Sequence, residues 1–210
     1  MTHERIAERL EPFLEDSSLS PSQLGQVATF TDLLLKWNAH MNLTAVRDPD
    51  EVIARHFGES LFAARHVFPT IPATNQTVID VGSGAGFPGI PLKIWEPTLH
   101  LTLVEANQRK AVFLREVVRA LRLSSVKVFA DRAERLSDQA SLVILRAVER
   151  FEKVLPIALK LLAKNGRIAL LIGSSQIESA KSALGEVEWQ DPLSLPLSQS
   201  RSLIVGRAAA

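Results

Sequence analysis

A glycine-rich segment near the middle of the chain carries the residue types best suited to binding a reactive small molecule. It reads VIDVGSGAGFPG over residues 78–89. Glycines let a chain turn sharply from a strand into a helix, and they leave bare backbone beside a ligand. Nicotinamide, flavin and sulfonium cofactors all bind at such turns, so the glycines alone do not identify the ligand.

The glycine spacing and one carboxylate distinguish between these cofactors. Gly82, Gly84 and Gly86 depart from the dinucleotide fingerprint, which has two residues between its second and third glycines. Asp80 would repel a pyrophosphate at a helix N-terminus, but it can attract the ammonium group of S-adenosylmethionine, directly or through water. The segment therefore favours S-adenosylmethionine, with a capping role as the alternative for Asp80.

Two further positions fit a nucleoside. Glu105 ends the second predicted strand, where a carboxylate can accept hydrogen bonds from both ribose hydroxyls of either cofactor type. Residues 131–134 follow the third predicted strand, where Ala133 and Glu134 can flank an adenine. The alternatives are a solvated loop charge at Glu105 and a helix start at Ala133-Glu134.

Helices are predicted for the first 70 residues. A capping serine, a proline and a glutamine at residues 20–23 begin one helix, and Asp48 with Pro49 begins the next. Prolines and polar residues at 69–77 then predict a loop. We therefore divide the chain into an N-terminal helical cap, residues 1–72, and a main domain, residues 73–210.

Strands and helices alternate in the main domain. A helix is expected over residues 109–121, with Val112 among its inward positions. Another follows residue 145; it should restart at Pro156 and stop at Asn165-Gly166. The alternation predicts a doubly wound, mostly parallel, seven-stranded α/β sheet of the S-adenosylmethionine-dependent methyltransferase type. Its strands are expected at residues 78–81, 99–104, 126–129, 142–145 and 167–172, and less clearly at 186–189 and 202–206.

Composition excludes several classes of protein. The 210 residues include no cysteine, which excludes disulfides, zinc–thiolate sites and a thiol nucleophile. No apolar run approaches the roughly 18 residues that span a bilayer, and no secretory signal begins the chain, so we expect a cytoplasmic protein without a membrane partner. Residues 105–135 hold eight basic and four acidic residues, a net charge of 8 − 4 = +4. This run is either a solvated helix face or a surface that faces RNA.

Several motifs together resemble one family, the bacterial small-subunit (16S) ribosomal RNA guanine-N7 methyltransferases, also called glucose-inhibited division protein B. The chain departs from the usual family pattern at Leu145, at Ile172 and at Glu59, where aspartate is usual. The motifs are KWN at 36–38, NLT at 42–44, RH at 55–56, SL at 60–61, DVGSGAGFPGIP at 80–91, RK at 109–110, FL at 113–114, RAE at 132–134 and RA at 146–147.

The resemblance implies S-adenosylmethionine as the cofactor and 16S ribosomal RNA, or the small ribosomal subunit, as the substrate. It implies no metal and no DNA partner, and the modest size favours a monomer. The residues expected to bind the cofactor are Asp80, Gly82, Gly84, Phe87, Glu105, Ala106, Ala133, Glu134 and Arg146. Those expected to contact RNA are Lys36, Arg55, His56, Arg109, Lys110 and Arg201.

The reaction itself places few demands on the residues. Guanine N7 has an in-plane lone pair and no proton, so it can attack a sulfonium methyl group without a general base, and alignment is the main task. A cation crowding N7 would oppose the positive charge of the product, so Arg146 should contact phosphate, O6 or the cofactor's surroundings. The alternatives are a methyltransferase of the same fold for a small molecule or protein, a nicotinamide-dependent oxidoreductase and a non-catalytic ribosome-assembly module.

Overall fold

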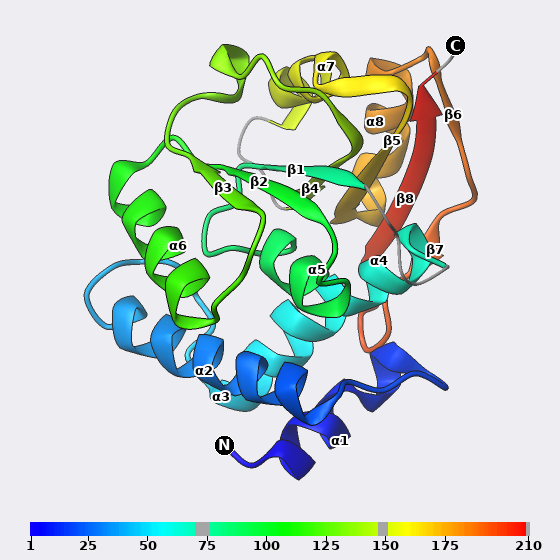
Figure 1. The fold of residues 1–210 in the computed structure, drawn as a ribbon. Helices are drawn as coiled ribbons and strands as arrows, with labels where there is room; N and C mark the ends of the chain where they lie inside the picture. Colours follow the sequence, from blue (N-terminus) through cyan, green and yellow to red (C-terminus); the bar gives the residue numbers. More distant parts are fainter. Residues whose placement is uncertain (70–75, 147–150, 209–210) are drawn as a thin grey trace.

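A twisted, mostly parallel sheet forms the centre of the protein, as the computed structural model shows for residues 1–69, 76–146 and 151–208 (Figure 1). The strand order is β3-β2-β1-β4-β5-β8-β6, with β7 paired to β8, and this confirms the predicted α/β architecture. The parallel strands are β1 (Thr77–Val81), β2 (His100–Val104), β3 (Val126–Phe129), β4 (Ala140–Arg146) and β5 (Leu162–Gly173). Strand β8 (Arg201–Ala208) runs antiparallel to β5, and β6 (Val187–Trp189) and β7 (Leu193–Ser194) run antiparallel to β8.

Helices cover both faces of this sheet. One face packs against α5 (Gly89–Trp95) and α6 (Gln108–Ala120), and the other against α7 (Phe151–Lys160) and α8 (Ile177–Ala183). Apolar side chains alternate between the two faces along β4: Leu142 and Ile144 point to one core, and Val143 and Leu145 to the other. This alternation is the period of two that a strand imposes, so each face of the sheet has its own apolar core.

The N-terminal helices pack below α5 and α6 (Figure 1). They are α1 (His3–Leu14), α2 (Pro21–Asn38), α3 (Pro49–Glu51), a π-helical segment (Val52–Gly58) and α4 (Glu59–Val67). The predicted capping box is confirmed: Ser20 accepts from the Gln23 backbone, and the Gln23 side chain accepts from Ser20. Gln23 also donates to the backbone of α5, which ties α2 to the main domain. The proposed boundary at residues 72–73 lies outside the described residues.

Three local predictions are wrong: the helix restart at Pro156, the helix stop at Asn165-Gly166 and the inward position of Val112. Pro156 lies inside α7, because it is on the exposed side of the helix, where water can satisfy the carbonyl freed by its missing N–H. The helix then ends at Lys160, and Asn165 forms a left-handed turn with a φ of 59° within β5. Val112 is 49% exposed rather than inward, because the buried stripe of α6 runs through Ala111, Phe113, Leu114 and Val117. No helix in the described part of the chain is long and apolar enough to cross a membrane.

Candidate functional site

A cavity of about 600 Å³ opens at the carboxyl ends of β1, β2 and β4. Ligands of doubly wound sheets bind at this edge. The first wall of the cavity consists of the glycine-rich turn and the residues that follow β2. The second wall consists of Leu43, Thr44 and His56 from the N-terminal region and of Arg146 at the end of β4. The lining residues are Leu43, Thr44, His56, Gly82, Ser83, Gly84, Ala85, Phe87, Glu105, Ala106, Asn107, Lys110 and Arg146.

The glycine-rich turn has the geometry that the sequence predicts. Gly84 has a φ of 56° and Gly86 a φ of 92°, which residues with a side chain rarely adopt. A Cβ at Gly86 would also lie 2.6 Å from Ile90 Cδ1. The backbone N–H groups of Gly82 and Ser83 donate to the carbonyl of Val104, so the turn is fastened to the end of β2.

Glu105 connects the two halves of this wall. Its Oε2 accepts from the Gly84 backbone at 2.9 Å, and its Oε1 accepts from the Asn107 backbone at 2.7 Å. Each carboxylate oxygen has a second lone pair free to accept from a ligand. Glu105 is therefore fixed in the wall with acceptor capacity to spare.

Asp80 lies beneath the turn rather than on the cavity wall. Its side chain is fully buried, Oδ2 accepts from the Gly89 backbone at 3.1 Å, and Oδ1 has no hydrogen-bond partner among the described residues. Burial raises the pKa of the Asp80 carboxyl to about 7, although the Gly89 N–H opposes the shift. The turn thus covers a carboxyl group with one unsatisfied oxygen.

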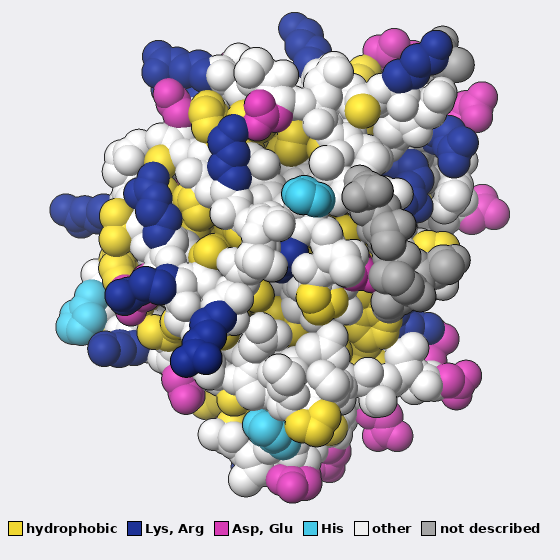
Figure 2. Space-filling view, viewed as in Figure 1, with side chains coloured by type: hydrophobic (Ala, Val, Ile, Leu, Met, Phe, Trp, Pro, Cys, Tyr) yellow, Lys and Arg dark blue, Asp and Glu magenta, His cyan; other side chains and the backbone are white. Residues whose placement is uncertain are grey.

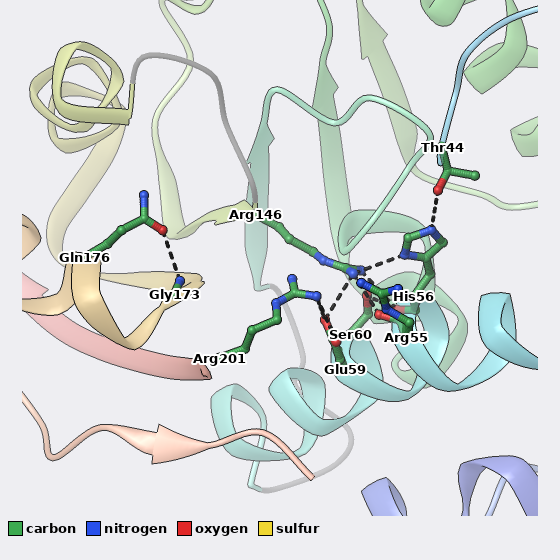
Figure 3. Close-up of polar contacts among 9 residues, drawn as sticks. All are labelled: Thr44, Arg55, His56, Glu59, Ser60, Arg146, Gly173, Gln176 and Arg201. Carbon is green, nitrogen blue, oxygen red and sulfur yellow. Dashed lines mark hydrogen bonds and ion pairs between the residues drawn. The ribbon is translucent and has the colours of Figure 1, made fainter. Parts of the chain in front are cut away.

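The opposite wall is held by Arg146, which ends β4 and reaches the π-helical segment (Figure 3). The guanidinium donates to the carbonyl oxygens of Arg55 at 2.7 Å and His56 at 3.3 Å, and Nη2 lies 3.1 Å from His56 Nδ1. The other ring nitrogen, Nε2, lies 2.7 Å from Thr44 Oγ1. Burial and the neighbouring arginines lower the pKa of His56 to about 3, so the ring is neutral at pH 7.

Glu59 lies behind this wall and pairs with two arginines (Figure 3). Its Oε2 is 3.0 Å from Arg146 Nη2 and 2.7 Å from Arg201 Nη1, and its side chain is 5% exposed. Burial lowers the pKa of Arg146 to about 10 and raises that of Glu59, and the guanidinium groups oppose the shift of Glu59. Arg201, predicted to contact RNA, is therefore engaged in a largely buried ion pair.

The other predicted residues lie at different distances from the cavity. Gly82, Gly84, Phe87, Glu105, Ala106, Arg146, His56 and Lys110 line it. Glu134 lines a separate depression with Asp131, Arg132 and Arg135, next to the buried Ala133. Lys36, Arg55 and Arg109 are exposed.

Sequence reasoning missed three residues that form or support the second wall: Thr44 lines the cavity, and Asn38 and Glu59 lie behind it. Thr44 and Asn38 stood in motifs that were used only for the family resemblance, and Glu59 appeared only as a departure from the family pattern. Asn38 is 5% exposed, and its amide accepts from the backbone of Leu43 and Thr44. The asparagine in the KWN motif, followed by the NLT motif, was the signal available for this contact.

Solved structures with the same fold include complexes with MeSAdo and with AdoMet. Pyrococcus horikoshii TYW2 in complex with MeSAdo has a TM-score of 0.60 at 15% identity, over 74% of this chain and 63% of that chain. A ribosomal protein L11 methylase from Lactobacillus delbrueckii has a TM-score of 0.61 at 12% identity, over 74% of this chain and 80% of that chain. At these identities the likeness shows the fold alone.

Sequence comparison identifies the family. The family model described as rRNA small subunit methyltransferase G matches residues 23–199. The protein named ribosomal RNA small subunit methyltransferase G of Chloroflexus aggregans is 40% identical over 89% of this chain and 82% of its own length. The protein of the same name from Bacillus subtilis is 35% identical over 90% of this chain and 84% of its own length. The chain belongs to the ribosomal RNA small subunit methyltransferase G family, the GidB family.

Proposed function

We propose that this protein transfers the methyl group of S-adenosylmethionine to N7 of a guanine in a loop of 16S ribosomal RNA. The observation that carries the proposal is the two-walled cavity at the carboxyl ends of β1, β2 and β4, in a chain that matches the family over residues 23–199. N7 lies on the major-groove edge of the base, which is out of reach inside an A-form helix, so a loop guanine is the fitting target. We also propose that the protein acts as a cytoplasmic monomer, without a DNA or membrane partner.

The cavity fits the cofactor on the chemistry of its donors and acceptors. The bound cofactor would supply an electrophilic methyl group. Glu105 would accept from the ribose hydroxyls, and the turn from Gly82 to Gly84, with Phe87 and Ala106, would hold the rest. The unsatisfied oxygen of Asp80 favours a cationic group above the turn, which suits the methionine ammonium. Glu134, which lines a separate depression, and the neighbouring Ala133 would flank the adenine.

The second wall fits an attack by N7 that needs no base. The His56 ring is uncharged at pH 7, and Arg146 directs its hydrogen-bond donors at the protein rather than leaving them free in the cavity. An uncharged His56 ring, and a guanidinium that is paired with Glu59, do not crowd the base with a free positive charge. The residues therefore serve the reaction by alignment of N7, the methyl carbon and sulfur.

Methyl transfer to small-subunit RNA from cells that lack the protein tests the proposal. We expect new 7-methylguanosine at one loop position when nucleosides are analysed by mass spectrometry, with naked RNA, assembly intermediates and complete subunits assayed in parallel. Cofactor binding by calorimetry without any product on the three RNA substrates would contradict the proposal and favour a small-molecule or protein substrate.

Glu105→Gln is expected to weaken S-adenosylmethionine binding by about 10-fold to 100-fold. In the glutamine variant an NH2 donor replaces one carboxylate oxygen and faces a backbone N–H. The variant also lacks the charged acceptor for a ribose hydroxyl, and a hydrogen bond to a charged group is worth about 1.5–3 kcal/mol. Calorimetric titration measures the change. Asp138→Asn, an exposed substitution of the same kind, should bind normally. Equal affinity for the wild type and Glu105→Gln would remove Glu105 from the proposed site.

RNA docking is proposed for the basic side of the molecule around α6. Figure 2 shows Lys and Arg side chains gathered on the left, over α6. Within the part of the chain that the structure describes, no acidic side chain forms an ion pair with Arg109 or Lys110. Lys127 and Arg135, by contrast, pair with Asp138 and Asp131. Unpaired cations beside the cavity suit RNA phosphates, and Lys36 and Arg55 would extend the contact.

The double variant Arg109→Gln/Lys110→Gln should reduce the slope of log K against log salt concentration for RNA binding by about two units, since each lost phosphate contact removes about one. Filter binding over a range of salt concentrations gives the slope. The control double variant Lys127→Gln/Arg135→Gln also removes two positive charges, but from residues that form ion pairs within the protein. It should therefore change the slope much less. If both double variants have the same slope, then the α6 face has no specific part in RNA docking.

A further inference from the structure

The polar atoms of the second wall form a hydrogen-bonded chain, and the direction of its bonds follows from Arg146, which can only donate. The chain begins at Thr44, whose backbone is held in place by Asn38. Asn38 Nδ2 donates to the Thr44 carbonyl at 2.9 Å, and Oδ1 accepts from the Thr44 N–H at 3.0 Å. Thr44 lines the same cavity as Glu105, but it comes from the N-terminal region and not from the segments to which the cofactor contacts are assigned.

Arg146 decides which nitrogen of His56 carries the proton. A guanidinium has donors and no acceptor, so the nitrogen that faces it must be an acceptor. Arg146 Nη2 lies 3.1 Å from His56 Nδ1, and Nδ1 is therefore unprotonated. A neutral imidazole with an unprotonated Nδ1 carries its hydrogen on Nε2, which lies 2.7 Å from Thr44 Oγ1. His56 is thus the donor in this bond, and Thr44 is the acceptor.

The hydroxyl of Thr44 has no free acceptor position. A hydroxyl has one donor hydrogen and two acceptor lone pairs. One lone pair accepts from His56 Nε2, and the other accepts from the backbone N–H of Val46 at 3.1 Å. The hydroxyl hydrogen has no acceptor among the residues that the structure describes. Thr44 therefore presents the cavity with a group that can donate a hydrogen bond but cannot accept one.

We propose that the Thr44 hydroxyl reads O6 of the target guanine and so makes the site specific for guanine over adenine. On the edge that carries N7, guanine presents the acceptor O6, whereas adenine presents the donor N6 amino group. A donor-only hydroxyl matches O6 and opposes the amino group. The contact at O6 leaves the lone pair of N7 free for the methyl group. This inference rests on the proposed function, since it assigns a residue to the base that the function requires.

Arg146 and His56 act as positioning residues in this scheme. Glu59 pairs with the guanidinium of Arg146 and also with Arg201, and Arg146 holds His56 in the tautomer that turns Thr44 into a donor. A buried polar group without its partner is costly, which is why a site built to hydrogen-bond a substrate atom rejects analogues that lack this atom.

The test combines variants of Thr44 with an altered base. Small subunits are assembled with ligated 16S RNA that carries either guanine or 2-aminopurine, which keeps N7 and lacks O6, at the methylated position. We expect the wild type to methylate guanine RNA about tenfold faster, in kcat/KM, than 2-aminopurine RNA because of this contact, beyond the intrinsic difference between the bases. Thr44→Val should lose about tenfold on guanine and little on 2-aminopurine, so the ratio between the bases falls about tenfold.

Two controls separate this role from others. Thr44→Ser keeps the hydroxyl and should keep the wild-type ratio between the bases. A loss of folding in Thr44→Val would lower the activity on both RNAs alike and would leave the ratio unchanged. Calorimetry should give the same S-adenosylmethionine affinity for all three proteins. An unchanged ratio in Thr44→Val would overturn the inference, whether or not the cofactor affinity is weakened. Absence of methylation of guanine RNA by the wild type would overturn the proposed function itself, which is a distinct result.

Discussion

Glu59→Gln is expected to lower the free energy of unfolding by about 3 kcal/mol, because it removes the negative charge that two arginines share in a largely buried place. The Arg146 and Glu59 side chains are 6% and 5% exposed, so water does little to compensate for the loss. Removing one member of a buried ion pair leaves the other as an uncompensated charge, and this accounts for most of the effect. Urea denaturation of the purified protein measures the change.

A second substitution separates the lost charge from a general disturbance of the core. Arg201→Met removes one of the two positive charges, so the double variant Glu59→Gln/Arg201→Met should be more stable than Glu59→Gln alone. As a control, Asp50→Asn breaks two ion pairs, with the exposed Arg5 and Arg9, and it should change the free energy of unfolding little. If Glu59→Gln were as stable as the wild type, the ion pairs of Glu59 would have no part in holding Arg146.

The first wall of the cavity could be predicted from the sequence because its determinants are local. The turn at residues 82–86 depends on the backbone conformations of its own glycines, and it follows a strand that the apolar residues of the sequence already predict. Glu105 ends the next strand, and parallel neighbouring strands end at the same edge of a sheet. Strand pairing then brings Glu105 to Gly84 without any detailed packing.

The second wall could not be predicted because its contacts join residues far apart in the sequence. Arg146 reaches His56 across 90 positions, and Arg201 reaches Glu59 across 142. Sequence reasoning placed Arg201 among the residues expected to contact RNA, and nothing in the sequence indicates its ion pair with Glu59. The partner was an acid on α4, and only the packing of α4 beside β8 makes the pair visible. Val112 shows a related limit, since an apolar residue at the edge of a helical stripe can face either way.

Asp80 should make the cofactor-free protein less stable as the pH rises from about 4 to about 7. Its pKa is about 7 in the folded protein and near 3.8 when unfolded, so in this range the folded state binds one more proton than the unfolded state. Stability falls with pH wherever the folded state binds more protons, and it should level off above pH 7. The expected loss is about 4 kcal/mol from the size of the shift, measured as the change in unfolding free energy between pH 4 and pH 8.

Asp80→Asn identifies the group responsible for this pH dependence. The amide oxygen can still accept from the Gly89 N–H, and the side chain no longer has a charge to bury. We therefore expect the variant to lose the Asp80 part of the slope and to be more stable than the wild type at pH 8, by about 2–4 kcal/mol. Asp131→Asn, in which an exposed carboxyl that accepts from Arg135 is replaced, should keep the slope.

If Asp80→Asn and the wild type lose stability equally between pH 4 and pH 8, then Asp80 is ionised without cost in the folded protein. The buried carboxyl would then have a partner for Oδ1. With that partner in place, the argument that a cationic cofactor group is needed above the turn would lose its basis.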